Sequence, residues 1–253
     1  MDSGENVALL ARGLRVVRGE KTVLRGVDVH AAAGEVLGVL GPSGAGKSTL
    51  FRAILGEIPT AAGRVTLGGE DVTRWPLWRR ARAGIGYIPQ GPSVLWELTV
   101  RANLAAFYRV VHGARAPEDA VRAAAAEVDL DTRLEVRAGE LSAGERRRLE
   151  FARAITRTPR VLICDEPFAG VDPVGAARLG ELLRDLATRG VAVVLADHHV
   201  AEALRICTRA LLLLDGAVAT EADPVRFQED PLVVGRYLGT WTRSIAPPPP
   251  VSE

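Results

Sequence analysis

Hydrophobic positions follow two different periods along this chain. Short, continuous apolar runs of the length of buried strands occupy residues 35–40, 161–165, 191–196 and 209–214. Amphipathic stretches with helical spacing begin at residue 47 and cover residues 173–189 and 199–206. This alternation of buried strands and helices predicts an α/β fold with a mainly parallel sheet flanked by helices.

Strands of a second kind are predicted in the first third of the chain. Residues 7–17 and 23–29 form two short strand patterns around a turn at residues 18–20. Another strand pattern at 63–69 closes with a glycine turn, and residues 85–90 form a strand pattern that ends at a proline. We therefore expect an antiparallel β edge beside the parallel sheet.

The middle of the chain is alanine-rich and helical in pattern, with predicted helices at 99–111, 117–130 and about 143–156. We interpret residues 91–157 as an all-helical subdomain inserted into a core of about 7–90 and 158–240, all within one domain of residues 1–246. Two short helices are expected near 223–228 and 231–238. The proline-rich residues 247–253 are expected to be a disordered tail.

A glycine-rich loop joins the apolar run at 35–40 to the helix that begins at Lys47. It fits the phosphate-binding pattern G-x-x-x-x-G-K-[ST] in the strand–loop–helix context that this pattern requires. Glycines let backbone N–H groups approach phosphate oxygens, and the helix N-terminus adds its positive dipole. We expect Lys47 to reach the β/γ-phosphates and Ser48 to bind Mg²⁺, with an ordinary glycine turn as the alternative. The candidate nucleotide-binding residues are Gly41, Pro42, Ser43, Gly44, Ala45, Gly46, Lys47, Ser48 and Thr49.

Two carboxylates, Asp165 and Glu166, end the apolar run at 161–165. Ligands of α/β sheets bind at the carboxyl ends of the strands, so both acids are expected near the phosphate-binding loop. Asp165 is a candidate Mg²⁺ ligand, through water. Glu166 is a candidate general base for the water that attacks the γ-phosphate. Acids solvated at a turn are the alternative.

The sequence Leu141-Ser142-Ala143-Gly144-Glu145 precedes the third predicted helix. Ser142 and Glu145 fit a capping box, and this interpretation leaves the arginines that follow on a solvated helix face. A capped helix N-terminus is also an anion site. Because one phosphate site already serves the nucleotide, we expect this second site to serve a neighbouring copy of the chain.

Polar residues at other strand ends complete the candidate site. Gln90 could sense Mg²⁺ or the attacking water, and His198 could hydrogen-bond the γ-phosphate. A free-standing histidine is more often a structural hydrogen bonder, and a metal site at the adjacent histidines 198 and 199 is disfavoured. Asp172 before a proline is typical of a helix N-cap. Val94, Leu95 and Trp96 line either a docking groove or the core of the helical block.

Composition narrows the class of protein. The 253 residues are 47% hydrophobic with a net charge of +1, so no basic field indicates nucleic acid as a partner. The two cysteines are expected to be buried, reduced thiols of a cytosolic protein. We expect no secretion signal and no membrane-spanning run, so any membrane role would require docking onto another chain.

These motifs, taken in order, resemble the ATP-binding subunit of ABC transporters over residues 7–240. The resemblance covers the phosphate loop, the Q-loop glutamine Gln90, the signature at 141–145, the Walker B pair Asp165 and Glu166, the D-loop ending at Asp172, and the switch histidine His198. It implies a P-loop, RecA-like fold, ATP and Mg²⁺ as cofactors, and a homodimer that holds each ATP between two chains. In such a dimer Ser142, Ala143, Gly144, Glu145 and Asp172 would belong to the nucleotide site, with Lys47, Gln90, Glu166 and His198 in catalysis and Ser48, Gln90 and Asp165 around the metal.

Within this family, residues 84–90, 144–148, 165–173 and 236–239 look most like the ATPases of lipopolysaccharide export. Three positions depart from the pattern. Val17 stands where the family usually has an aromatic that stacks on adenine, Ala143 replaces a signature glycine, and His199 replaces an asparagine. The change at residue 17 predicts weak discrimination between ATP and GTP.

The resemblance implies an ATP hydrolase that drives a separate integral-membrane subunit, docked near residues 90–96, from the cytoplasmic face of the inner membrane. Lipopolysaccharide or lipid export is the first hypothesis for its cargo, and branched-chain amino-acid import is the alternative. A soluble ATPase acting on ribosomes or DNA is a more remote hypothesis, because neither tandem cassettes nor basic extensions are present. A nucleotide sensor without hydrolysis is disfavoured by Glu166 and His198.

Overall fold

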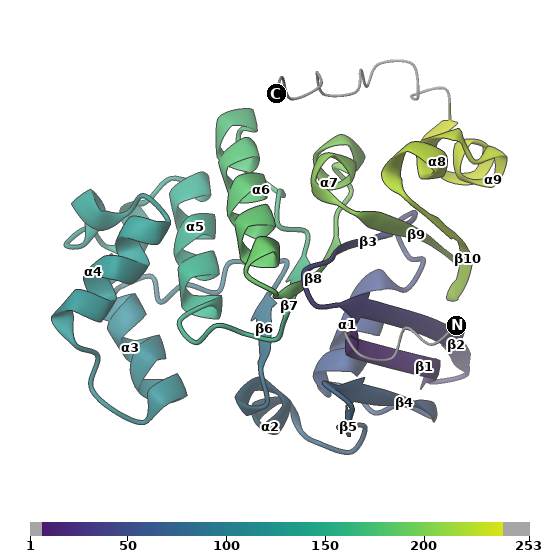
Figure 1. The fold of residues 1–253 in the computed structure, drawn as a ribbon, viewed down its shortest axis with the longest axis horizontal. Coiled ribbons are helices and arrows are strands. Elements are labelled where there is room, and N and C mark those ends of the chain that lie inside the picture. Colours follow the sequence, from purple (N-terminus) through teal and green to yellow (C-terminus); the bar gives the residue numbers. More distant parts are fainter. Residues whose placement is uncertain (1–6, 240–253) are drawn as a thin grey trace.

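The computed structural model describes residues 7–239 and contains two sheets (Figure 1). The first has six strands in the order β10-β9-β3-β8-β7-β6, and the second has four in the order β2-β1-β4-β5. The central strands of the larger sheet are parallel, as the alternation of strands and helices predicts. Its strands are β3 (Val36–Leu40), β6 (Ile85–Ile88), β7 (Val161–Asp165), β8 (Ala192–Ala196), β9 (Arg209–Leu214) and β10 (Ala217–Ala222).

Side chains of the larger sheet point alternately into two cores. Val36 and Leu40 of β3 pack into the core beneath α6 (Pro173–Thr188) and α7 (Val200–Ile206), whereas Leu37 and Val39 pack toward α1 (Lys47–Leu55) and the antiparallel sheet. Because both faces are covered, the central strands β3, β7, β8 and β9 carry apolar side chains at successive positions, with few exceptions, instead of at every second one.

The smaller sheet forms the predicted antiparallel edge. Its strands are β1 (Val7–Arg18), β2 (Lys21–Ala32), β4 (Ala62–Leu67) and the short β5 (Glu70–Asp71). The hairpin turn between β1 and β2 is shorter than residues 18–20, because Arg18 already pairs with Lys21. The backbone N–H of Arg25 on β2 donates to Gly216 O, which joins this sheet to the turn before β10.

Three helices of the middle segment lie together on one side of the molecule (Figure 1): α3 (Val100–His112), α4 (Glu118–Glu127) and α5 (Ala143–Ala154). The second helix ends before residue 130, because Asp129 adopts a left-handed φ of 56° that a continuing helix cannot contain. Thr99 caps α3 by accepting a hydrogen bond from the Ala102 N–H.

Several elements were not predicted. The helix α2 (Leu77–Arg82) lies in a stretch rich in arginine and tryptophan, and β10 is an edge strand whose composition lacks a clear hydrophobic run. The helix expected at 231–238 is instead α9 (Pro231–Val233) followed by a π-helix (Val234–Leu238), after α8 (Pro224–Glu229). The expected proline-rich tail at 247–253 lies outside the described residues.

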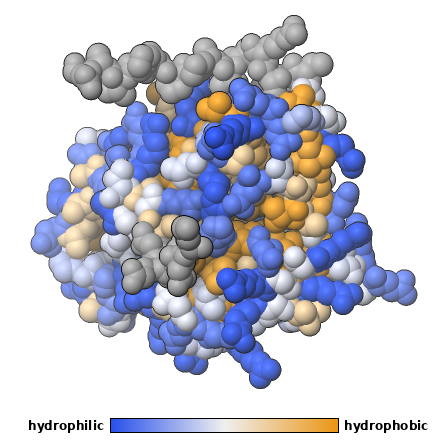
Figure 2. Space-filling view, turned by 45° about the vertical axis from the view of Figure 1, so that its right-hand side comes forward, coloured by the Kyte–Doolittle hydropathy of each residue, from blue (hydrophilic) through white to orange (hydrophobic). Residues whose placement is uncertain are grey.

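Within residues 7–239, the structure contains no helix that is both long and apolar enough to cross a membrane. The face turned forward in Figure 2 carries hydrophobic patches framed by hydrophilic side chains. Such a mixed surface is usual for a folded domain, because polar groups are too few to cover it.

Candidate functional site

The glycine-rich loop connects β3 to α1 and leaves the start of that helix open. Gly46, the N-cap residue, has a left-handed φ of 111° and contributes no side chain to capping. The first N–H groups of α1 are therefore available to an anion. Gly41 is required by a close approach, since a Cβ there would lie 2.2 Å from Leu213 O.

Lys47 folds back over this loop. Its Nζ donates hydrogen bonds to the carbonyl oxygens of Gly41 at 2.6 Å and Pro42 at 3.0 Å. Burial lowers the pKa of Lys47, while the negative charges of Glu166, Asp165 and Asp197 counteract part of that decrease. The loop thus holds an ammonium group beside the positions where its own backbone can bind phosphate.

Asp165 ends β7 and is buried. Its Oδ1 accepts a hydrogen bond from Ser48 Oγ at 3.3 Å. Burial is the largest cause that raises the pKa of Asp165, and neighbouring Glu166 adds to it. A hydroxyl and a carboxylate this close are hard oxygen donors of the kind that Mg²⁺ prefers, so the residues present fit that ion.

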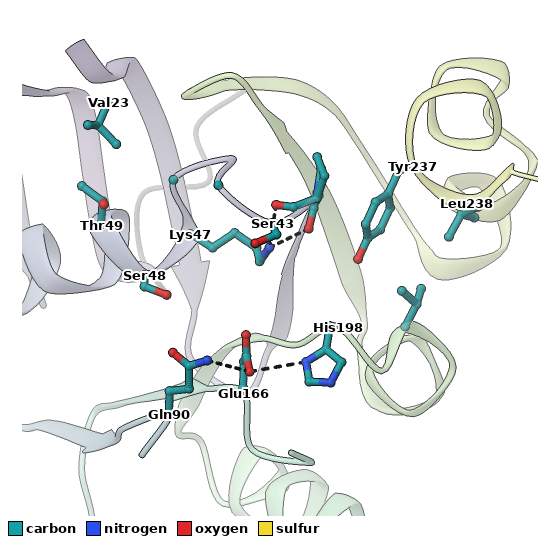
Figure 3. A pocket seen from close by; sticks show the side chains of 15 residues that line it. Val23, Ser43, Lys47, Ser48, Thr49, Gln90, Glu166, His198, Tyr237 and Leu238 are labelled. Atoms are coloured by element: carbon teal, nitrogen blue, oxygen red, sulfur yellow. Dashed lines mark hydrogen bonds and ion pairs between the residues drawn. The ribbon is translucent and has the colours of Figure 1, made fainter. Parts of the chain in front are cut away.

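Glu166 changes the direction of the chain immediately after β7. It has a left-handed φ of 51°, and its N–H donates to Ala196 O at 2.7 Å. Its carboxylate accepts a hydrogen bond from Gln90 Nε2 at 2.9 Å and lies 3.4 Å from His198 Nδ1 (Figure 3). These three side chains follow the neighbouring strands β6, β7 and β8, so the parallel sheet brings them to one edge. We call Lys47, Gln90, Asp165, Glu166 and His198 the phosphate edge.

The loop that carries His198 is held by Asp197, which is fully buried. Its carboxylate accepts hydrogen bonds from the backbone N–H groups of Phe168 and His199, and it lies 2.8 Å from His199 Nδ1. Asp197, His198 and His199 could also hold a metal ion by distance alone. Because the hydrogen bonds already use the Asp197 oxygens, the geometry favours a structural role for Asp197 and His199.

A cavity of about 700 Å³ lies against the phosphate edge. Most of the predicted phosphate-loop residues line it, together with Gln90, Glu166 and His198. Sequence reasoning did not anticipate Val23, Val200, Tyr237 and Leu238, which also line it (Figure 3). The sequence did offer one indication that Tyr237 and Leu238 matter, since residues 236–239 contributed to the family resemblance.

Val17 does not line this cavity. Its side chain is 43% exposed on β1 and pairs across the hairpin with Thr22, next to Val23. The placement of Val17 at the adenine position therefore stays a prediction. The apolar side chain that lines the cavity near this hairpin is that of Val23.

Residues 142–145, which we call the signature segment, also lie outside the cavity lining. Both halves of the capping box are present: the Glu145 N–H donates to Ser142 Oγ at 3.2 Å, and the Ser142 N–H donates to Glu145 Oε2 at 2.8 Å. Ala143 is the first residue of right-handed α5, so its methyl group introduces no left-handed strain. Nearby, Asp172 caps α6 through the N–H groups of Val174 and Gly175.

The arginines after the signature segment do not all face solvent, which corrects the expectation of a solvated face. Arg147 is buried and forms an ion pair with Glu150 at 2.7 Å. Its guanidinium also donates to the carbonyl oxygens of Pro89, Asp165, Glu166 and Pro167. This arginine therefore connects α5 to the backbone of the phosphate edge.

The segment 93–98 combines a buried anchor with exposed apolar side chains. Val94 is buried in the core, whereas Leu95 and Trp96 are exposed. Buried Asn103 holds the segment by accepting from the Leu95 N–H and donating to the Leu95 and Leu98 carbonyl oxygens. Core packing thus explains Val94 but not Leu95 or Trp96.

Comparisons with known proteins agree with this geometry. Residues 24–169 match the family described as ABC transporter. The chain belongs to the ABC transporter ATPase family. It binds ATP and hydrolyses it. The cavity lined by the phosphate loop, Gln90, Glu166 and His198 is where we expect the nucleotide to bind.

Curated relatives of this ABC ATPase include two named lipopolysaccharide export system ATP-binding protein LptB. The protein from Acidithiobacillus ferridurans is 40% identical over 220 residues, covering 87% of this chain and 91% of the relative. That from Escherichia coli (strain K12) is 35% identical over 239 residues, covering 94% and 96%. A similar solved structure is the ADP conformation of an ATP-binding cassette of an ABC transporter, with a TM-score of 0.84, 26% identity, and coverage of 92% and 99%.

Proposed function

We propose that this ABC ATPase works as a homodimer that closes around two ATP molecules and drives a membrane subunit of a lipopolysaccharide or lipid exporter. The observation that carries the dimer is the position of the signature segment. It is the capped start of α5, where the helix dipole favours an anion, yet it lies outside the cavity that its own phosphate loop lines. A second copy facing the first would supply it to the nucleotide.

Mg²⁺ would be held by Ser48 and Asp165, with Gln90 near the attacking water. The ion would supply charge neutralisation at the terminal phosphates. Glu166 would accept a proton from the water, while Gln90 and His198 keep its carboxylate in position through the contacts described above. Lys47 would bind the β/γ-phosphates once its carbonyl partners are exchanged for phosphate oxygens.

Leu95 and Trp96 support the proposed docking surface for the membrane subunit. They are exposed hydrophobic side chains on a segment that Asn103 fixes, and that segment follows Gln90 directly. A partner bound here would contact the chain within a few residues of the nucleotide. The docked subunit would keep the ATPase at the cytoplasmic face of the inner membrane, and no nucleic acid takes part.

The cargo assignment is supported by the relatives named for lipopolysaccharide export, which the chain matches over nearly its whole length. Purification of the ATPase from its own host in mild detergent, with identification of the membrane subunits that accompany it, tests this assignment. Amino-acid permease subunits in place of lipid-export subunits would overturn the cargo and leave the ATPase unaffected.

The dimer is tested with Ala143→Glu in a Glu166→Gln background. Glu166→Gln alone should bind ATP, hydrolyse it at least about 100-fold more slowly, and dimerise when ATP is added. Ala143 is an exposed first-turn residue of α5, so a glutamate there suits the helix dipole but repels the phosphates of an opposing chain. The double variant should stay monomeric with ATP in analytical ultracentrifugation.

The matched control is Val225→Glu, which places the same charge at an exposed first-turn position of α8. This variant should dimerise like its parent. An ATP-dependent dimer that survives Ala143→Glu, or a single Ala143→Glu variant with normal turnover, would contradict the proposed interface. Normal turnover by Glu166→Gln would contradict the role of Glu166.

A further inference from the structure

Tyr237 reaches the nucleotide cavity from the far end of the described chain. It belongs to the π-helix that follows α9, and π-helical turns are found frequently at functional sites. Figure 3 shows its ring beside the phosphate loop, with the hydroxyl directed toward the space between that loop and His198. Val23 lies on the opposite side of the loop.

The Tyr237 hydroxyl oxygen is buried. The Gly41 backbone N–H approaches it as a donor, and the hydroxyl hydrogen itself has no acceptor among residues 7–239. Buried polar groups nearly always have a partner, because an unpaired one loses its hydrogen bonds to water without replacement. The hydroxyl therefore indicates an acceptor that the described part of the chain does not supply.

The hydroxyl is a hydrogen-bond donor at neutral pH. Burial raises the pKa of Tyr237, and hydrogen bonding from the Gly41 backbone N–H lowers it by less, so the phenol keeps its proton. A protonated phenol beside the first residue of the phosphate loop suits an anionic oxygen. The neighbouring Lys47 and the open start of α1 favour the same kind of ligand.

The backbone around Tyr237 is anchored, so the hydroxyl has a defined position. Phe227 and Val233 on either side of the α8–α9 turn are fully buried in the core. Asp230 accepts hydrogen bonds from the Leu232 N–H and from the Thr220 hydroxyl, which connects α9 to β10. A side chain held in this way can select a ligand by position.

We propose that the Tyr237 hydroxyl donates a hydrogen bond to an oxygen of the terminal phosphate of bound ATP. The residue would thereby distinguish ATP from ADP and connect the C-terminal helices to the loaded phosphate loop. Its position near His198 and away from Val23 favours the terminal phosphate over the base. This inference rests on ATP binding in the cavity and is independent of the proposed dimer and cargo.

The test compares Tyr237→Phe with Tyr108→Phe, each in the Glu166→Gln/Ala143→Glu background to avoid hydrolysis and dimer closure. Tyr108 lies on α3 and stacks on His112, outside the cavity lining, so its change removes the same atom elsewhere. Calorimetric titration with Mg-ATP and with Mg-ADP should show ATP affinity falling about 10-fold or more for Tyr237→Phe, because hydrogen bonds to charged groups are strong. ADP affinity should stay within about twofold for both variants.

Equal losses of ATP and ADP affinity would mean that the hydroxyl only supports the loop, and unchanged ATP affinity would mean that it makes no contact. Either result overturns the inference, as does an equal effect of Tyr108→Phe. Matching thermal unfolding of the two variants excludes a folding defect, since phenylalanine keeps the ring. A parent protein that fails to bind ATP would contradict the assigned function instead.

Discussion

The phosphate edge contains a strained backbone and poorly solvated charges, whereas the signature segment has the regular geometry of a helix N-cap. At the phosphate edge, Glu166 adopts a left-handed φ, Asp165 is a buried carboxylate with a raised pKa, and Lys47 is a half-buried amine with a lowered pKa. In the signature segment, the side chains of Ser142 and Glu145 each accept a hydrogen bond from the other residue's backbone N–H. Strain and buried charge collect where a protein binds and reacts.

This difference indicates which region is complete within one chain. The proposed function accounts for the costly groups at the phosphate edge, because a bound nucleotide and a metal ion would use them. The signature segment forms its own capping hydrogen bonds without a ligand, and in the proposed dimer it would contact the ATP bound to the other chain. The three predictions that follow test this contrast, beginning with the largest expected effect.

Lys47→Ala should abolish nucleotide binding and lower ATP hydrolysis by roughly 10²–10³-fold or more, because one preorganised charged donor contributes that much to a transition state. The chain contains only two lysines, so Lys21→Ala is a natural control. Lys21 is exposed at the start of β2 and should be replaceable without effect on the rate. Steady-state hydrolysis and fluorescent-nucleotide binding measure both variants, and a Lys47→Ala protein that still binds ATP normally would contradict the assignment of the loop.

Arg147→Met examines the connection between the two regions, since this buried arginine begins in α5 and reaches the backbone of Asp165 and Glu166. Removing it leaves Glu150 buried without its ion-pair partner, so the free energy of unfolding should fall by about 3–5 kcal/mol. Arg122→Met on α4 removes an exposed ion pair with Glu118 and should cost less than about 1 kcal/mol. Urea unfolding compares them, and equal small losses would show that the two regions are not connected through Arg147.

Residues of the phosphate edge could be proposed from sequence because parallel strands end together. A buried run followed by two acids, a glycine-rich loop and a histidine after a strand all point to one sheet edge. Arg147 was missed because three consecutive arginines look like a solvated face until the packing partners of the helix are known. Tyr237 was missed because its approach to Gly41 depends on how α8 and α9 fold back over β9 and β10.

Elements without a hydrophobic pattern could not be predicted from the sequence either. The edge strand β10 has mixed exposure, and α2 is a single short helix in a basic stretch, so tertiary contacts decide both. The end of α4 depends on one residue, Asp129, whose left-handed conformation the sequence pattern does not reveal. The buried strands of the larger sheet were predictable, because a sheet covered on both faces favours apolar side chains at successive positions.

The smallest expected effects are changes in stability, and these should have opposite signs in the two regions. Asp165→Asn removes a buried charge while keeping an acceptor for Ser48, so at pH 7 it should raise the melting temperature by roughly 2–4 °C while abolishing Mg²⁺-dependent hydrolysis. Ser142→Ala removes a cap and should instead lower the free energy of unfolding by about 1 kcal/mol. Differential scanning calorimetry measures both changes.

The pH dependence of Asp165→Asn provides a second measurement of the same charge. The pKa of Asp165 is higher in the folded chain than in the unfolded one, so its ionisation destabilises the fold as pH rises through the folded value. As pH falls, the native carboxyl protonates and the cost disappears, so the stability gained by asparagine should shrink toward zero below about pH 4, near the unfolded pKa of aspartate. A gain that stays constant between neutral and acidic pH, or a loss of stability at pH 7, would show that Asp165 is not a charge held at the expense of the fold.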